Sequence, residues 1–156
     1  MRQARYYLVV VALWVCAGLA HAGMAGPVVA VLDGDTVDVL VDRKPVRVRL
    51  AEIDAPEKGQ PFGTRSRQAL ASAVFRQQVS VRVSGNDRYG RTIGTLLLDG
   101  VNINHWMVAE GWAWAYRPYV VDRRLFEIED AAKAAGRGLW SEPEPVPPWE
   151  WRRRRP

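Results

Sequence analysis

The sequence predicts an α+β fold, a five-stranded β-barrel with about three helices packed outside it. Apolar and polar residues alternate with a period of two through the first half of the chain, as is typical of half-buried strands. A helical spacing of apolar residues separates the third predicted strand from the fourth. The length of 156 residues, 48% of them hydrophobic, suits one core and is too short for two.

The predicted strands are short and rich in β-branched residues. They cover residues 28–32, 37–41, 46–50, 79–83 and 91–98. Asp33-Gly34-Asp35 forms the first turn, and a polar loop over 84–90 joins the last two strands.

Three helices are predicted, over residues 64–75, 103–110 and 121–135. Gly111 and Gly136 end the second and third, since glycine is favoured just past a helix C-terminus. A helix between the third and fourth of five short strands favours a closed barrel of the oligonucleotide-binding (OB) type. An open meander is the competing topology.

The first 22 residues have the composition of an export signal. Arg2 and Arg5 precede an apolar run over 6–20, and Ala20-His21-Ala22 supplies the small residues of a cleavage site. Because the run is shorter than the ~20 residues of a membrane-spanning helix, cleavage after Ala22 is favoured over an uncleaved anchor. We therefore predict a signal peptide over 1–22 and a secreted or periplasmic mature chain, a monomer without a membrane segment.

Composition excludes several classes of site. The single cysteine, Cys16, lies in the predicted signal, which rules out a disulfide framework and a multi-cysteine zinc centre. No glycine-rich P-loop pattern is present, so nucleotide hydrolysis of that kind is excluded. The net charge of +5 suits an acidic partner.

The last residues differ in composition from the rest. A proline-rich stretch precedes four consecutive arginines at 152–155. We predict a folded domain over 23–141 and a disordered tail over 142–156, whose arginines are solvated or, alternatively, clamp phosphates. Trp149 and Trp151 either stack on bases or dock on the domain.

Acidic and basic side chains fall where predicted strands meet loops. Taken singly, each cluster is also typical of an ordinary turn or a charged sheet edge. Together, Asp35 and Asp54 can converge at the barrel rim and suit a hard cation such as Ca²⁺. Glu57 can polarise a water there, and Arg49 and Arg91 can grip phosphate oxygens. This combination is what phosphodiester hydrolysis needs.

Three ordered blocks, residues 31–36, 49–57 and 87–91, resemble the signatures of the staphylococcal (micrococcal, thermo-) nuclease family. Gly138-Leu139-Trp140 resembles the family's C-terminal ending, so the resemblance covers about residues 28–141. It implies the same five-stranded barrel that the residue pattern predicts.

The resemblance also implies roles for the acidic block. Asp35 and Asp54 match the family's calcium-binding carboxylates. Ala55, where the family often has threonine, matches a ligand that contributes its backbone carbonyl. Glu57 matches the glutamate assigned as general base.

By the same resemblance, Arg49 and Arg91 match the catalytic phosphate-binding arginines. The residues that match the lining of the nucleotide pocket are Arg88, Tyr89, Tyr116 and Tyr119. Calcium is the implied cofactor, and DNA and RNA, single- or double-stranded, are the implied partners.

The resemblance implies a calcium-dependent endonuclease that leaves 3′-phosphates. The alternative is a catalytically inactive OB-fold module that binds nucleic acid or a protein partner. Such degenerate domains typically lose one of the catalytic residues, whereas Arg49, Glu57 and Arg91 are all present here.

Overall fold

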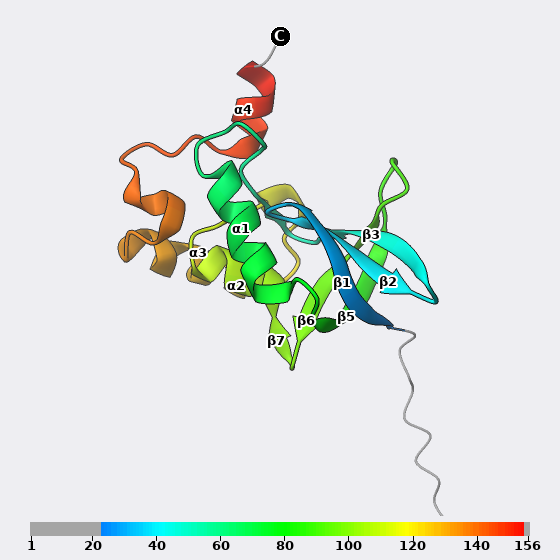
Figure 1. Ribbon diagram of the computed structural model, residues 1–156. Helices are drawn as coiled ribbons and strands as arrows, with labels where there is room; N and C mark the ends of the chain where they lie inside the picture. The colour runs from blue at the N-terminus through cyan, green and yellow to red at the C-terminus, as the bar shows by residue number, and fades with distance from the viewer. Residues whose placement is uncertain (1–22, 155–156) are drawn as a thin grey trace, which may run out of the picture.

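A barrel of mostly antiparallel strands forms the centre of the structure, a computed structural model that describes residues 23–154 (Figure 1). The predicted signal peptide lies outside the described residues. The barrel strands are β1 (Met24–Asp33), β2 (Thr36–Val41), β3 (Lys44–Leu50), β5 (Gln78–Asn86) and β6 (Thr92–Leu98). Strand β7 (Val101–Asn102) extends the sheet beyond β6.

Closure of the barrel depends on one parallel pairing. The strand order is β3-β2-β1-β5-β6, and β3 then pairs with β6 through Val48 and Thr92, Arg49 and Ile93, and Leu50 and Gly94. This confirms the closed five-stranded barrel, and the open meander is wrong. The pairing also places the end of β3 beside the start of β6.

The core follows the period-two pattern of the strands. Val37, Val39 and Val48 are fully buried inside the barrel, and Leu70 and Val74 of the first helix pack against it. Each fully buried side chain of this size contributes roughly 1.5–3 kcal/mol relative to exposure.

Helices cover one side of the barrel in Figure 1. They are α1 (Gly63–Val74), α2 (Ile103–Ala109), α3 (Arg124–Ala134) and α4 (Pro148–Arg154), with 3₁₀ turns η1 (Arg117–Tyr119) and η2 (Gly138–Ser141). Among the described residues, none of these helices has the length and apolar character needed to cross a membrane.

A second, two-stranded sheet lies at the rim. Strand β4 (Ile53–Asp54) pairs with β8 (Trp114–Ala115), so that Asp54 is opposite Trp114. This small sheet connects the segment after β3 to the segment that carries the predicted pocket tyrosines.

Three predicted boundaries were wrong, the first being the start of β1, which begins at Met24 rather than at Val28. Strand β5 continues to Asn86, because its pairing with β6 resumes after an irregularity between Val83 and Gly85. The last predicted helix begins at Arg124 rather than near Val121, since the backbone N–H groups of Val121 and Asp122 donate to the Glu52 carboxylate.

The prediction of a disordered tail was also wrong for the described part of 142–156. Residues Pro148–Arg154 form α4. Proline is well tolerated in the first turn of a helix, and Glu150 near the start and arginines near the end complement the helix dipole. Aromatic contacts then hold α4 on the domain: the Trp149 ring centroid lies 6.4 Å from that of Trp114 and 5.6 Å from that of Tyr116.

Candidate active site

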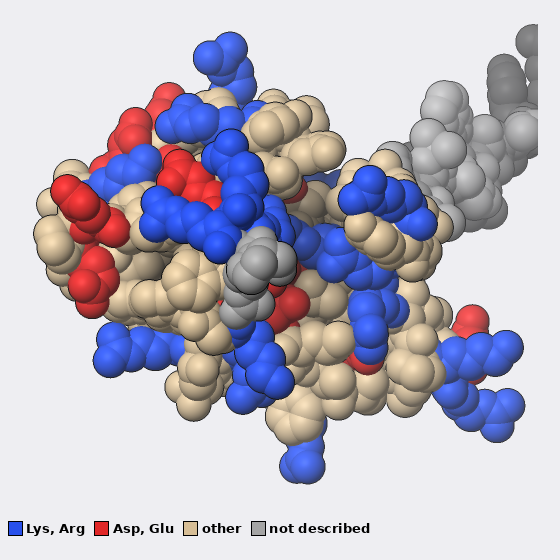
Figure 2. All heavy atoms as spheres, turned by 90° about the horizontal axis from the view of Figure 1, so that it is seen from above, with Lys and Arg blue, Asp and Glu red and all other residues tan. Residues whose placement is uncertain are grey.

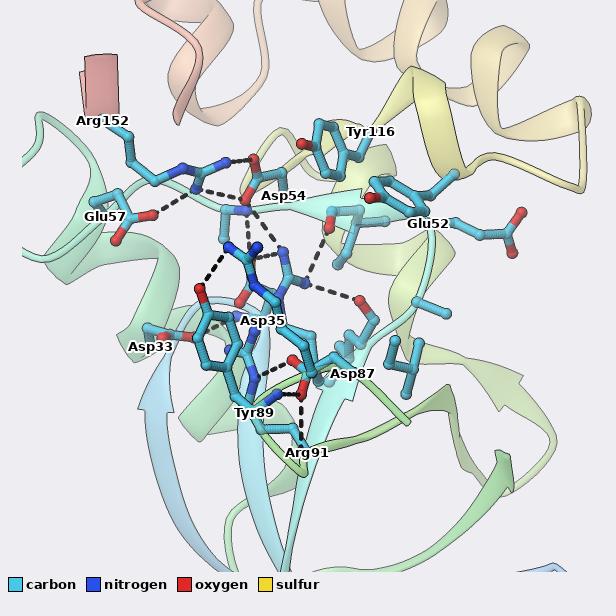
Figure 3. A pocket seen from close by; sticks show the side chains of 18 of the residues that line it. Asp33, Asp35, Glu52, Asp54, Glu57, Asp87, Tyr89, Arg91, Tyr116 and Arg152 are labelled. Carbon is cyan, nitrogen blue, oxygen red and sulfur yellow. Dashed lines mark hydrogen bonds and ion pairs between the residues drawn. The ribbon is translucent and has the colours of Figure 1, made fainter. Parts of the chain in front are cut away.

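A pocket of about 790 Å³ lies at the barrel rim, between the β1–β2 turn, the β3–β4 segment, the β5–β6 loop and the turn η1 (Figure 3). Every predicted site residue lines it: Asp35, Arg49, Asp54, Ala55, Glu57, Arg88, Tyr89, Arg91, Tyr116 and Tyr119. Residues up to 84 positions apart in the chain are thereby brought into one cavity.

Two buried carboxylates converge on one guanidinium. Arg49 Nη2 lies 3.1 Å from Asp35 Oδ2 and 3.1 Å from Asp54 Oδ1. The other terminal nitrogen, Nη1, donates to the carbonyl oxygens of Leu50 and Ile53 at 2.9 and 3.0 Å. Arg49 is therefore held in a single orientation between the two acids.

Asp35 is positioned by the turn that contains it, by the neighbouring strand β3 and by the segment after β4. Its backbone N–H donates to Asp33 Oδ1 at 3.1 Å, the local hydrogen bond that favours aspartate in such turns. Its carbonyl accepts from Leu50 N–H at 2.8 Å, and its Oδ2 accepts from Ala55 N–H at 2.7 Å. Gly34 is required in this turn because a Cβ there would collide with Ser66 of α1.

Burial perturbs the titration of this acid. Loss of solvent raises the pKa of Asp35 to about 8, although Arg49 opposes the shift, and Asp33 adds to it. The positive charge of Arg49 thus offsets only part of the cost of burying a negative charge on Asp35. A metal cation bound beside Asp35 would offset the rest.

The available ligands are hard oxygen donors. Among residues 23–154, no group of three or more His, Cys, Asp or Glu side chains converges as a complete metal site. A cation held by Asp35 and Asp54 would therefore need backbone carbonyl and water oxygens as further ligands. Such a mixed oxygen set fits Ca²⁺ better than it fits zinc or another thiophilic ion.

Glu57 lies near this acid pair, in the loop before α1. Its backbone N–H donates to Gln60 Oε1 at 3.0 Å, and its carbonyl accepts from Gln60 N–H at 2.9 Å. The side chain is 37% exposed, so solvent reaches it. Its Oε1 accepts a 2.6 Å hydrogen bond from Arg152.

The second predicted arginine lies at the other end of the pocket (Figure 3). Arg91 Nε is 2.7 Å from Asp87 Oδ2, and the backbone N–H groups of Tyr89 and Arg91 donate to Asp87 Oδ1. Burial alone would raise the pKa of Asp87, but the hydrogen bonds from Arg91 hold it below its ordinary value. Arg91 therefore lines the pocket while paired to a carboxylate other than Asp35 and Asp54.

Aromatic side chains complete the wall. Tyr89 is 70% exposed, with the Arg88 guanidinium 4.8 Å from its ring centroid. Tyr116 and Tyr119 lie 5.1 Å apart between centroids, and Tyr116 N–H donates to the Glu52 carbonyl at 2.8 Å. Three tyrosines thus face one cavity beside arginines.

Sequence reasoning missed Glu52, Asp87 and Arg152. Glu52 and Asp87 lie inside the quoted motifs, so their position was a usable signal. The sequence contains no local signal for the role of Arg152, because its partner Asp54 is 98 positions away in the chain. Seen from the α4 side, lysine and arginine side chains cover much of this face, with acidic side chains between them (Figure 2).

The structure is a closed barrel of the OB type, with a buried acid pair, flanking guanidiniums and tyrosines at one rim. Residues 47–142 match the family described as "Staphylococcal nuclease homologue". The chain belongs to this family, as its motifs predict.

Similar proteins come from enteric bacteria. "Micrococcal nuclease" of Shigella flexneri is 52% identical over 145 residues, covering 86% of this chain and 83% of the relative. "Protein ParB" of Escherichia coli is 49% identical over 153 residues, covering 91% and 86%. An "Uncharacterized endonuclease" of Escherichia coli O157:H7 is 47% identical over 135 residues, covering 86% and 88%.

Proposed function

We propose that this protein is a calcium-dependent endonuclease that hydrolyses phosphodiester bonds of DNA and RNA and leaves 3′-phosphates. One observation carries the proposal: Asp35 and Asp54 approach the same nitrogen of Arg49, in a pocket that also contains Glu57 and Arg91. The cavity therefore contains carboxylates that can bind a metal ion, a carboxylate that can accept a proton and guanidiniums that can bind phosphate.

Asp35 and Asp54, with the backbone carbonyl of Ala55, are the residues that would hold calcium. The fit rests on two buried carboxylates that share one guanidinium and line the same pocket as Ala55. When bound, the ion supplies positive charge against the phosphate oxygens.

The remaining chemistry belongs to the side chains. Glu57 takes a proton from the attacking water as its oxygen bonds to phosphorus. The bond between phosphorus and the 5′-oxygen breaks, and that oxygen leaves as a hydroxyl after taking a proton from solvent, to which Glu57 returns its own proton. Arg49 and Arg91 offset the negative charge that grows on the phosphate oxygens, for which guanidinium geometry is well suited. To bind the phosphate in this way, the Arg91 guanidinium must give up its ion pair with Asp87.

The tyrosines supply the nucleotide-binding wall. Tyr89, Tyr116 and Tyr119 present aromatic faces, on which bases of any sequence can stack. Arg88 adds a cation beside Tyr89.

The proposal includes the place of action. An apolar segment follows Arg2 and Arg5, and the only cysteine precedes residue 23, so the mature chain needs no disulfide. We propose that the protein acts as a monomer in the periplasm or outside the cell.

Digestion of denatured DNA and of RNA, with Ca²⁺ and with a chelator, tests this proposal. We expect cleavage with calcium only, and products that a polymerase extends only after phosphatase treatment. Negligible cleavage under both conditions, with nucleic-acid binding retained, would instead identify an inactive binding module.

A further inference from the structure

Arg152 of α4 occupies the acidic end of the pocket. Its Nη2 lies 2.7 Å from Asp54 Oδ2, and its Nη1 donates to Asp54 Oδ1 at 3.2 Å and to Glu57 Oε1 at 2.6 Å. One guanidinium thus bridges the candidate metal ligand and the candidate base (Figure 3).

Trp149, one turn earlier in the same helix, covers one face of Tyr116, a tyrosine that lines the pocket. Its ring is stacked on that of Tyr116, with an interplanar angle of 17° and 5.6 Å between centroids. This is the arrangement that a nucleobase adopts on an aromatic side chain. The Tyr116 face that Trp149 covers is therefore not open to a base.

We propose that residues 146–154, the C-terminal strap, are an autoinhibitory element in which Arg152 replaces the cation at Asp54 and Trp149 replaces a base on Tyr116. The inference rests on the function proposed above. It explains why one short helix places Arg152 against two acids of the pocket and Trp149 against a tyrosine of its wall.

Competition at Asp54 follows from its hydrogen bonds. Oδ1 already accepts from Arg49 and Arg152, and Oδ2 accepts from Arg152. A cation needs those same oxygens and is repelled by the charge of Arg152, which holds both oxygens of Asp54, so the cation and Arg152 compete for this carboxylate. The apparent association constant for the cation is then the intrinsic constant multiplied by the fraction of molecules in which the strap is open.

The strap is attached by the ring contacts of Trp149, the ion pairs of Arg152 and a hydrogen bond from Gln60. Gln60 Nε2 donates to the carbonyl of Val146 at 2.6 Å, and α4 itself has seven residues. The Arg152 side chain is 43% exposed, so water can solvate it as soon as it leaves Asp54. A released Arg152 would be available to the phosphates of a bound strand, and such a contact would stabilise the open state.

Calcium titration by calorimetry of the full-length wild type, Arg152→Ala and Arg153→Ala tests the proposal. Arg153 is the matched control, because it carries the same charge on the same helix but does not line the pocket. We expect Arg152→Ala to bind calcium roughly three- to tenfold more tightly than either, the scale of a partly exposed two-point ion pair. If Arg152→Ala binds calcium with unchanged or weaker affinity, the proposal that the strap is autoinhibitory is wrong.

A second measurement examines the contact of Trp149 with Tyr116 without calcium. In chelator, we expect Trp149→Ala to bind a fluorescent single-stranded oligonucleotide several-fold more tightly than the wild type, and Trp149→Phe, which keeps a ring, to change less. Weaker binding by Trp149→Ala would assign Trp149 to substrate binding and overturn its inhibitory role.

The two proposals fail in different ways. If the wild type and Arg153→Ala bind calcium and cleave DNA while Arg152→Ala gains no affinity, only the strap is wrong. If no variant binds calcium or cleaves DNA, the proposed function is wrong, and the strap is wrong with it.

Discussion

The backbone N–H of Ala55 donates a 2.7 Å hydrogen bond to Asp35 Oδ2, across 20 positions of the chain. This bond joins the β1–β2 turn to the segment after β3, which contains Asp54. Because Asp35 is held from both its turn and this distant segment, the distance between the two acids is set by the barrel and does not depend on a flexible loop.

Glu57→Gln tests the proton acceptor. We expect turnover to fall by roughly 10²–10⁴-fold, the typical contribution of a general base, because the amide cannot take the proton. The thermal unfolding midpoint should stay close to that of the wild type, since the side chain lies at the surface of the pocket. Single-turnover cleavage of DNA measures the first quantity, and near-normal turnover would remove Glu57 from this role.

Glu52 holds the loop that carries the tyrosines. Its carboxylate accepts from the backbone N–H groups of Val121 and Asp122 at 2.5 and 2.7 Å. Glu52→Ala should raise KM for an oligonucleotide more than it lowers kcat, because Tyr116 and Tyr119 lose their support. Glu127→Ala, on exposed α3 surface, is the control. An equal KM in both variants would contradict the positioning role.

Glu129 is a buried carboxylate that connects α3 to β8. It accepts from Ala115 N–H at 3.0 Å and from Lys133 Nζ at 2.8 Å. Glu129→Ala leaves the buried N–H unpaired, so we expect a loss of about 1–3 kcal/mol in the free energy of unfolding. Glu129→Gln keeps an acceptor and should lose less. Urea unfolding compares them, and equal losses would show that the hydrogen bond to Ala115 is not the cause.

Asp122 makes stability depend on pH in acid. Hydrogen bonding from Arg124 lowers the pKa of Asp122 to about 2, below its ordinary value of 3.8. A carboxylate with a lowered pKa in the folded state stabilises the protein above the unfolded pKa, and this stabilisation is lost as pH falls toward 2. Thermal unfolding between pH 2 and 5 should therefore vary less steeply in Asp122→Asn than in the wild type. Parallel curves would contradict the assignment.

The strands were predictable because their signal is local. Valines that alternate along the second and third strands identify a buried face within a few residues, and the turn at Asp33-Gly34-Asp35 has its own local chemistry. The extension of β5 to Asn86 was missed, since polar residues there pair with β6 without being buried.

Most of the site was also predictable, because its residue types sit in motifs at the ends of strands. The pairing of Arg91 with Asp87 and of Glu52 with the 121–122 backbone was not predicted, although both acids lie in the quoted motifs. Motifs show which side chains are available, but not which partner each one has in the folded chain.

Short-range pattern was enough to specify the barrel strands, the helix between them and the chemical types at the rim, because alternation and turn preference act over neighbouring residues. The position of α4 depended on three-dimensional packing. Four arginines after a proline-rich stretch look solvated when no partner is near in the chain, and only the folded domain presents Asp54, Glu57 and Tyr116 together for Arg152 and Trp149 to meet.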